Sequence, residues 1–128
     1  MRLLLDTNRY GDLVANDPKV TERLDSAMAV YLSAITLGEL HFGFALGSKR
    51  ERNEMRLREA LTLQGVQSLG IDVETAQYYG QIATKLRLSG TPIPSNDIWI
   101  AALALQHDLT LDTRDDHFKL ASGLKLVE

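Results

Sequence analysis

Short apolar runs alternate along this chain with longer segments of helical periodicity, and this alternation restricts the possible fold more than any other feature. The first run, Arg2-Leu3-Leu4-Leu5, is too short for a helix and ends abruptly at Asp6. A run of this kind is typical of a strand inside a parallel sheet that helices cover on both faces. We expect further strands over residues 29–33, 66–69, 109–111 and 124–127.

Helix-start signals stand between most of these runs. Asp17-Pro18 predicts a helix over 17–24, Asp72 caps a helix that ends before Gly90, and Ser95 begins a third helix with an apolar stripe. Capping-box spacing at 36–39 and 48–51 predicts two more helix starts. Strands that alternate with helices of this length predict an α/β fold with a mainly parallel sheet. The length of 128 residues predicts one domain.

The composition excludes several classes of function. The absence of cysteine rules out a disulfide framework, a thiolate zinc site and cysteine catalysis. No run of about 18 apolar residues is present, so we expect no membrane span, and the first acid comes too early for a signal peptide. These features fit a cytoplasmic protein. The net charge of −3 argues at first against a nucleic-acid partner.

Four acids stand at the ends of predicted strands or in the first turns of predicted helices: Asp6, Glu39, Asp97 and Asp115. Each acid taken alone also fits a structural role in a turn or at a helix start. In a parallel sheet, however, ligands bind beyond the carboxyl ends of the strands. We therefore expect the four carboxylates to meet at one edge of the sheet.

A cluster of carboxylates without cysteine or paired histidine suits Mg²⁺ or Mn²⁺ better than zinc. Carboxylates this close repel one another unless a cation lies among them. Such centres hydrolyse phosphoesters, because the ion activates water and offsets charge on the phosphate. With four acids assigned to the ion, the remaining acids no longer outnumber the basic residues, and the objection to a nucleic-acid substrate disappears.

Four short motifs occur in the order of a known family. They are Leu5-Asp6-Thr7-Asn8, Gly38-Glu39-Leu40, the segment 96–102 and the segment 113–118. Together they resemble the PIN domain, most closely the VapC-type toxins of VapBC toxin–antitoxin pairs. The resemblance spans residues 1–127. It implies a single PIN-like domain over 1–128, a three-layer sandwich whose central sheet lies between helices. It also implies a Mg²⁺- or Mn²⁺-dependent endoribonuclease, a homodimer, and a VapB-like antitoxin that lies across the active-site cleft.

The resemblance also implies roles for single residues. The acidic quartet of the family falls on Asp6, Glu39, Asp97 and Asp115, and its supporting hydroxyl falls on Thr113. The implied reaction is in-line attack by a metal-activated water that leaves a 5′-phosphate and a 3′-hydroxyl. Asp6, Asp97 and Asp115 hold the metal, while Glu39 holds it through water or orients the nucleophile.

Two residues depart from the family pattern, because Arg9 and Asp112 stand where it usually has apolar residues. Asp115 is preferred over Asp112 and Asp116 as the fourth acid, since Thr113-x-Asp115-x-x-Phe118 keeps the family spacing. Whether Asp112 or Asp116 assists Asp115 stays open at this point.

Several further residues have two interpretations. Arg9 and Arg114 adjoin the acidic motifs and are candidate phosphate contacts. The basic stretch Lys49–Arg58 fits a solvated helix face as well as an RNA-binding surface. Phe42 and Phe44 are expected in the core, with a protein interface as the alternative.

Trp99 is likewise expected in the core rather than as a platform for a stacked base. The three histidines, His41, His107 and His117, lack metal-ligand spacing, and we expect them to have structural roles.

Other functions fit less well. A phosphatase of the haloacid dehalogenase type needs a second acid two residues after the first, where this chain has Asn8. A phospho-acceptor receiver domain needs an acidic pair, and Asp6 has no acidic neighbour before Asp12. Within the PIN interpretation, a housekeeping RNA-processing nuclease and a non-catalytic module that binds RNA or protein remain as alternatives.

Overall fold

A sheet of five parallel strands in the order β3-β2-β1-β4-β5 forms the centre of the computed structural model, which describes residues 1–127. Its first strand pairs with β2 on one side and with β4 on the other. The expected mainly parallel sheet is therefore confirmed. The strands are β1 (Arg2–Leu5), β2 (Ala29–Ser33), β3 (Gln67–Leu69), β4 (Thr110–Asp112) and β5 (Lys125–Leu126).

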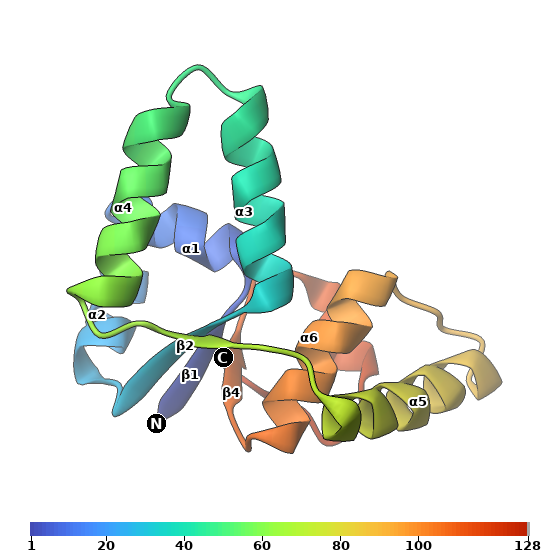
Figure 1. Ribbon diagram of the computed structural model, residues 1–128. Coiled ribbons are helices and arrows are strands. Elements are labelled where there is room, and N and C mark those ends of the chain that lie inside the picture. Colours follow the sequence, from blue (N-terminus) through green and yellow to red (C-terminus); the bar gives the residue numbers. More distant parts are fainter. Residues whose placement is uncertain (128) are drawn as a thin grey trace.

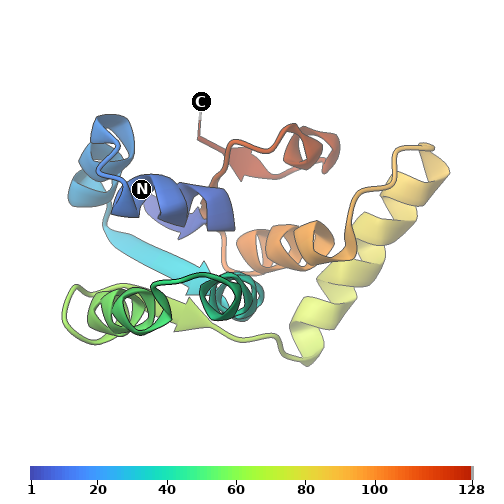
Figure 2. The same ribbon diagram turned by 90° about the horizontal axis from the view of Figure 1, so that it is seen from above.

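Helices connect the strands and extend beyond their carboxyl ends. Figure 1 shows α3 and α4 as an antiparallel pair that projects away from the sheet, and Figure 2 shows α5 and α6 on the side away from α2 and α4. Among residues 1–127, no helix combines the length and apolarity that crossing a bilayer requires. The helices are α1 (Thr7–Val14), α2 (Pro18–Ser26), α3 (Ala34–Leu46), α4 (Arg50–Thr62), α5 (Val73–Leu88), α6 (Ser95–Gln106) and the short 3₁₀ helix η1 (Asp116–Leu120).

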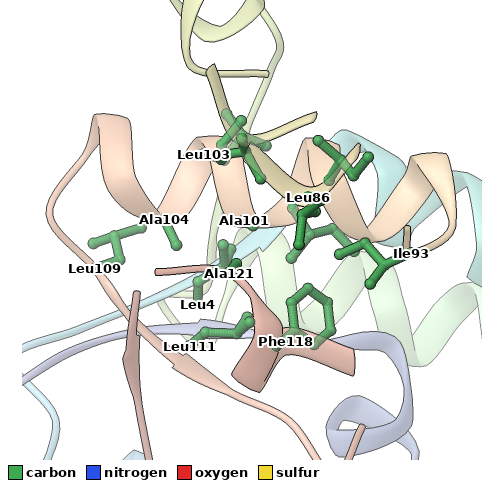
Figure 3. Close-up of a cluster of buried hydrophobic side chains, with 14 residues drawn as sticks. Leu4, Leu86, Ile93, Ala101, Leu103, Ala104, Leu109, Leu111, Phe118 and Ala121 are labelled. Atoms are coloured by element: carbon green, nitrogen blue, oxygen red, sulfur yellow. The ribbon is translucent and has the colours of Figure 1, made fainter. Parts of the chain in front are cut away.

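Neighbouring residues of β1 contribute to two separate cores. Leu4 packs with buried side chains of α5, α6, β4 and η1 (Figure 3). Leu5 packs with Leu32 and with buried side chains of α1, α3 and α4. Successive side chains of a strand point to opposite faces, so helices cover both faces of the sheet. This confirms the three-layer α/β architecture and explains why the three buried residues of β1, Leu3, Leu4 and Leu5, are all apolar.

Three helix starts differ from expectation. α1 was not predicted; it begins because the Asp6 carboxylate accepts a hydrogen bond from the Thr7 amide at 2.8 Å. α3 begins before the predicted box at 36–39, because the buried Ser33 hydroxyl at the end of β2 accepts from the amide of Thr36 at 3.0 Å. The predicted box at 48–51 is also wrong, since Lys49 precedes α4 and no side chain caps that helix.

Two aromatic residues expected in the core lie elsewhere. Phe42 is 69% exposed on the outer side of α3, whereas Phe44 is partly buried against the core that contains Leu5, which we call the Leu5 core. Trp99 is half-buried, and its ring packs against Tyr79 with 4.1 Å between the centroids. The periodicity of a helix places Phe42 and Phe44 about 200° apart around the axis, so only one of them can face the sheet.

Two leucines near the end of α5 allow a test of the core that contains Leu4, which we call the Leu4 core. Leu86 is buried there at 3% exposure, while Leu88 is 83% exposed. We expect Leu86→Ala to lower the free energy of unfolding by about 2–5 kcal/mol, because truncation leaves a cavity. Leu88→Ala should change it by less than about 0.5 kcal/mol. Urea unfolding followed by circular dichroism measures both variants, and equal losses would contradict the assignment of this core.

Candidate functional site

Asp6 is the most firmly held of the four predicted acids. Its amide donates to the Asp112 carbonyl at 3.0 Å, which ties the end of β1 to the end of β4. One carboxylate oxygen, Oδ1, accepts from the Thr7 amide at 2.8 Å, and the other, Oδ2, accepts from the Thr113 hydroxyl at 2.7 Å. The residue is only 6% exposed. Asp6 therefore ends a strand, begins a helix and fixes a neighbouring loop.

The loop after β4 folds around the Thr113 hydroxyl. The hydroxyl oxygen accepts a hydrogen bond from the Asp115 amide at 3.0 Å, and the hydroxyl proton is donated in a hydrogen bond to Asp6. The Asp115 carboxylate in turn accepts from the His117 amide at 2.9 Å, which begins η1. Thr113 thus lies between two of the predicted acids and is hydrogen-bonded to both.

The other two acids come from helices. Glu39 lies in the second turn of α3, not in the first turn as expected, because that helix begins at Ala34. Its Oε1 accepts a hydrogen bond from the Thr7 hydroxyl at 2.8 Å, so it is not the capping partner of Thr36. Asp97 lies in the first turn of α6, as predicted, with its side chain 16% exposed.

Each of the four carboxylates interacts by its charge with at least one of the others. Burial raises the pKa of Asp6, and the charges of Glu39 and Asp115 raise it further, against the lowering effect of hydrogen bonds from Thr113 and Thr7. Burial also raises the pKa of Asp97, together with the charges of Asp115 and Asp6. The structure therefore brings the predicted quartet together, and the negative charge at this point is unfavourable without a proton or a cation.

His117 joins this group, although its spacing in the sequence did not indicate a metal site. Its Nδ1 lies 3.1 Å from Oδ1 of Asp115 and 3.4 Å from Oδ2 of Asp97, and the ring is 52% exposed. The hydrogen bond from His117 lowers the pKa of Asp97. The one sequence signal that could have placed His117 beside the acids is its position two residues after Asp115. These contacts fit the expected structural role of His117 and also place its ring beside two of the acids.

The two neighbouring aspartates face away from the quartet. Asp112 is completely buried, and its carboxylate accepts hydrogen bonds from Nε of Arg9 at 3.0 Å and Nε of Arg23 at 2.9 Å. The Asp116 side chain is 85% exposed and pairs with Lys119 at 2.9 Å. Asp115 alone of the three lies beside Asp6 and Asp97.

Arg9 and Arg114, the candidate phosphate contacts, are both bound to carboxylates. Arg9 donates to Asp12 at 3.2 Å as well as to Asp112, and Arg114 donates to Asp12 through Nε at 2.8 Å. We call the connected charges the Asp112 network; its members are Arg23, Asp112, Arg9, Asp12 and Arg114. It ties α1 and α2 to the loop that carries Thr113 and Asp115. The two departures from the family pattern, Arg9 and Asp112, thus contact each other.

A comparison with family models decides the classification, since the model of the PIN domain matches residues 3–124. The chain belongs to the PIN domain family. Its relatives include toxin FitB of Neisseria gonorrhoeae, 40% identical over 121 residues that cover 88% of this chain and 87% of that protein. Ribonuclease VapC1 of Haemophilus influenzae is 35% identical over 119 residues, which cover 90% of this chain and 87% of the relative.

Solved structures agree with this classification. The VapBC2 complex of Rickettsia felis bound to a promoter DNA fragment contains a chain that matches with a TM-score of 0.87 and 27% identity, over 99% of this chain and 98% of that one. VapBC-1 of nontypeable Haemophilus influenzae matches with a TM-score of 0.86 and 32% identity, over 100% and 98%. The resemblance of this PIN domain to the VapC-type toxins is confirmed.

The Asp112 network makes a testable contribution to the stability of this PIN domain. Asp112→Asn removes the charge that compensates two guanidinium groups in a buried place. We expect it to lower the free energy of unfolding by roughly 3–5 kcal/mol, the usual cost of breaking a buried ion pair. Asp116→Asn, in the same loop but exposed, is the control and should cost less than about 0.5 kcal/mol. Equal urea midpoints for the two variants would contradict the role of the network.

The raised pKa of Asp97 gives a pH-dependent prediction for the metal-free protein in EDTA. Folding raises this pKa above its usual value of 3.8, so the ionised carboxylate destabilises the fold at pH 7. Asp97→Asn should therefore increase the melting temperature at pH 7. The gain in melting temperature should shrink as the pH falls through the raised pKa. It should vanish below about pH 3.8, where Asp97 is protonated in the folded and unfolded wild type and is as neutral as the asparagine of the variant.

Differential scanning calorimetry between pH 3 and pH 8 measures this difference. Asp25→Asn, at an exposed position of α2, is the control for the loss of one surface charge. A gain that is the same at all pH values would show that Asp97 is not destabilised by its charge.

Proposed function

We propose that this PIN domain is a Mg²⁺- or Mn²⁺-dependent endoribonuclease and the toxin of a VapBC-type toxin–antitoxin pair. The observation that carries the proposal is the meeting of Asp6, Glu39, Asp97 and Asp115 at one edge of a parallel sheet. Several relatives of matching length are ribonucleases by name. The matching solved structures include toxin–antitoxin complexes, which supports a VapB-like antitoxin as partner.

The donor set fits a hard divalent cation. The quartet offers carboxylate oxygens, and each oxygen of Asp6 that accepts one hydrogen bond keeps a second lone pair for another partner. Burial and the neighbouring carboxylates raise the pKa values of Asp6 and Asp97, so the ionised forms of both side chains are disfavoured. A divalent ion compensates their negative charge, so Asp6, Asp97 and Asp115 are the residues that would hold it.

The residues of the site divide the work of phosphodiester hydrolysis. When bound, the divalent ion lowers the pKa of water and offsets negative charge on the phosphate. Thr113 holds Asp6 and the Asp115 loop in one arrangement, so the ligand oxygens need little reorganisation. Glu39 is exposed and is fixed by Thr7, so it can reach a water molecule, orient it for in-line attack and accept its proton.

The surroundings suggest how RNA and other chains are bound. The stretch Lys49–Arg58 runs from the α3–α4 connection along α4, where its charged side chains are mostly exposed. We propose this stretch, together with Arg114 at the edge of the site, as a contact for RNA phosphates. We also propose that the protein forms a homodimer, and the exposed Phe42 on α3 is a candidate interface residue.

Removal of a single carboxylate tests the proposal. We expect Asp6→Asn and Asp97→Asn to lower the rate of RNA cleavage in Mg²⁺ by roughly three orders of magnitude or more, because each group acts in the transition state. Asp116→Asn should leave the rate within about twofold of the wild type, since Asp116 faces solvent. End-labelled RNA, incubated with each purified variant with and without EDTA, gives the rates and the cleavage positions.

The alternatives predict different results. Wild-type protein that binds RNA but does not cleave it in Mg²⁺ or Mn²⁺ would be a binding module. Cleavage that persists unchanged in Asp6→Asn would overturn the proposed site. Cleavage without growth arrest on expression, and without an antitoxin encoded beside the gene, would indicate a housekeeping nuclease.

A further inference from the structure

We propose that His117 is a nitrogen ligand at the outer edge of the acidic centre and that it shifts the metal preference from Mg²⁺ towards Mn²⁺ and Zn²⁺. The inference rests on the proposed function in one respect, namely that a divalent cation binds between Asp97 and Asp115. It adds a ligand of a different chemical type to a centre of oxygen donors. That ligand changes which ions the protein selects.

The spacing of the three side chains fits a coordination shell. Nδ1 of His117 lies 3.1 Å from Asp115 Oδ1 and 3.4 Å from Asp97 Oδ2, and the potential ligand atoms of the three residues all lie within 4.8 Å of one another. With metal–ligand bonds of about 2.1 Å, neighbouring ligand atoms are separated by roughly 3.0 Å in an octahedron and 3.4 Å in a tetrahedron. The two separations from Nδ1 therefore match those of neighbouring ligand atoms around one cation.

The backbone holds the imidazole in this place. The His117 amide donates to the Asp115 carboxylate at 2.9 Å, so the two side chains are positioned by the same turn. The next residue, Phe118, is completely buried in the Leu4 core and anchors η1 against the sheet (Figure 3). The ring itself is 52% exposed, which leaves it accessible to an ion from solvent.

A nitrogen donor changes the order of metal affinities. Mg²⁺ favours oxygen ligands and water, whereas imidazole suits transition metals, and zinc combines it readily with carboxylates. The carboxylates of the quartet attract all divalent ions. His117 should therefore strengthen the binding of Mn²⁺ and Zn²⁺ while contributing little to Mg²⁺. The cysteine-free composition excludes a thiolate zinc site but not this mixed site.

Metal titration of the full chain separates the ions. Isothermal titration calorimetry with MnCl₂, ZnCl₂ and MgCl₂ compares the wild type with His117→Ala and with the control His41→Ala. His41 is a similarly exposed histidine on α3, with its Nδ1 3.6 Å from Glu54. We expect His117→Ala to raise the Kd of Mn²⁺ and Zn²⁺ by about tenfold or more and that of Mg²⁺ by less than about twofold. His41→Ala should change none of the three. Circular dichroism checks that both variants are folded.

A spectroscopic signature distinguishes coordination from a general effect of charge or structure. Electron spin-echo measurements on bound Mn²⁺ should show coupling to an imidazole nitrogen in the wild type and in His41→Ala, but not in His117→Ala. Absence of this coupling in the wild type would overturn the proposal. An equal loss of affinity for all three ions in His117→Ala would overturn it as well, because a structural or electrostatic role has no preference among them.

The two proposals fail in different ways. If nitrogen coupling is present but Asp6→Asn cleaves RNA as fast as the wild type, the nuclease assignment fails while the role of His117 stands. If RNA cleavage depends on Asp6 and on Mg²⁺ but Mn²⁺ shows no nitrogen coupling, the nuclease assignment stands and the role of His117 fails.

Discussion

The hydrogen bond between the Thr113 hydroxyl and the Asp6 carboxylate is the contact on which the rest of the site depends. Four carboxylates at one place repel one another, so their positions must be fixed by other interactions. Asp6 is held by the strand before it, the helix after it and Thr113, and Thr113 in turn holds the amide of Asp115. The fully buried residues 3–5 make the end of β1 a rigid base for this arrangement. The core thus stabilises a local charge distribution that is unfavourable by itself.

The positions of the acids could be predicted because they follow from topology rather than from local detail. Parallel strands end at the same edge of a sheet, and Asp6 and Asp115 each follow a strand that the apolar runs indicate. The exact helix starts could not be predicted in this way. Ser33 and Thr36 both carry a hydroxyl suited to capping, and the choice of Ser33 depends on where β2 ends. Because of that error, Glu39 was expected in the first turn of α3, whereas it lies in the second. Its side chain still meets Thr7, so the error did not remove it from the site.

Interactions between distant residues were beyond the reach of sequence patterns. Arg9 and Asp112 are 103 residues apart, and each by itself is only a charged residue in an apolar position. A buried carboxylate needs a partner, and which residues supply it for Asp112 depends on how α1 and α2 pack beside β4. His117 is a similar case, since only the fold of the Asp115 loop brings its ring to Asp97.

The Asp112 network and the quartet place carboxylates three residues apart in opposite electrostatic environments. Asp112, the last residue of β4, lies in the sheet and receives hydrogen bonds from two guanidinium groups, so its charge is compensated within the fold. Asp115 lies beyond the sheet, where its side chain faces other carboxylates and one imidazole. Neither Arg9 nor Arg23 can leave Asp112 easily, because its departure would leave a buried charge with fewer partners. The charge of Asp112 is therefore neutralised within the fold, whereas Asp115 lacks an arginine partner, which supports the proposed metal site at Asp115 and not at Asp112. The end of the strand separates the acid that stabilises the fold from the acids that are available for chemistry.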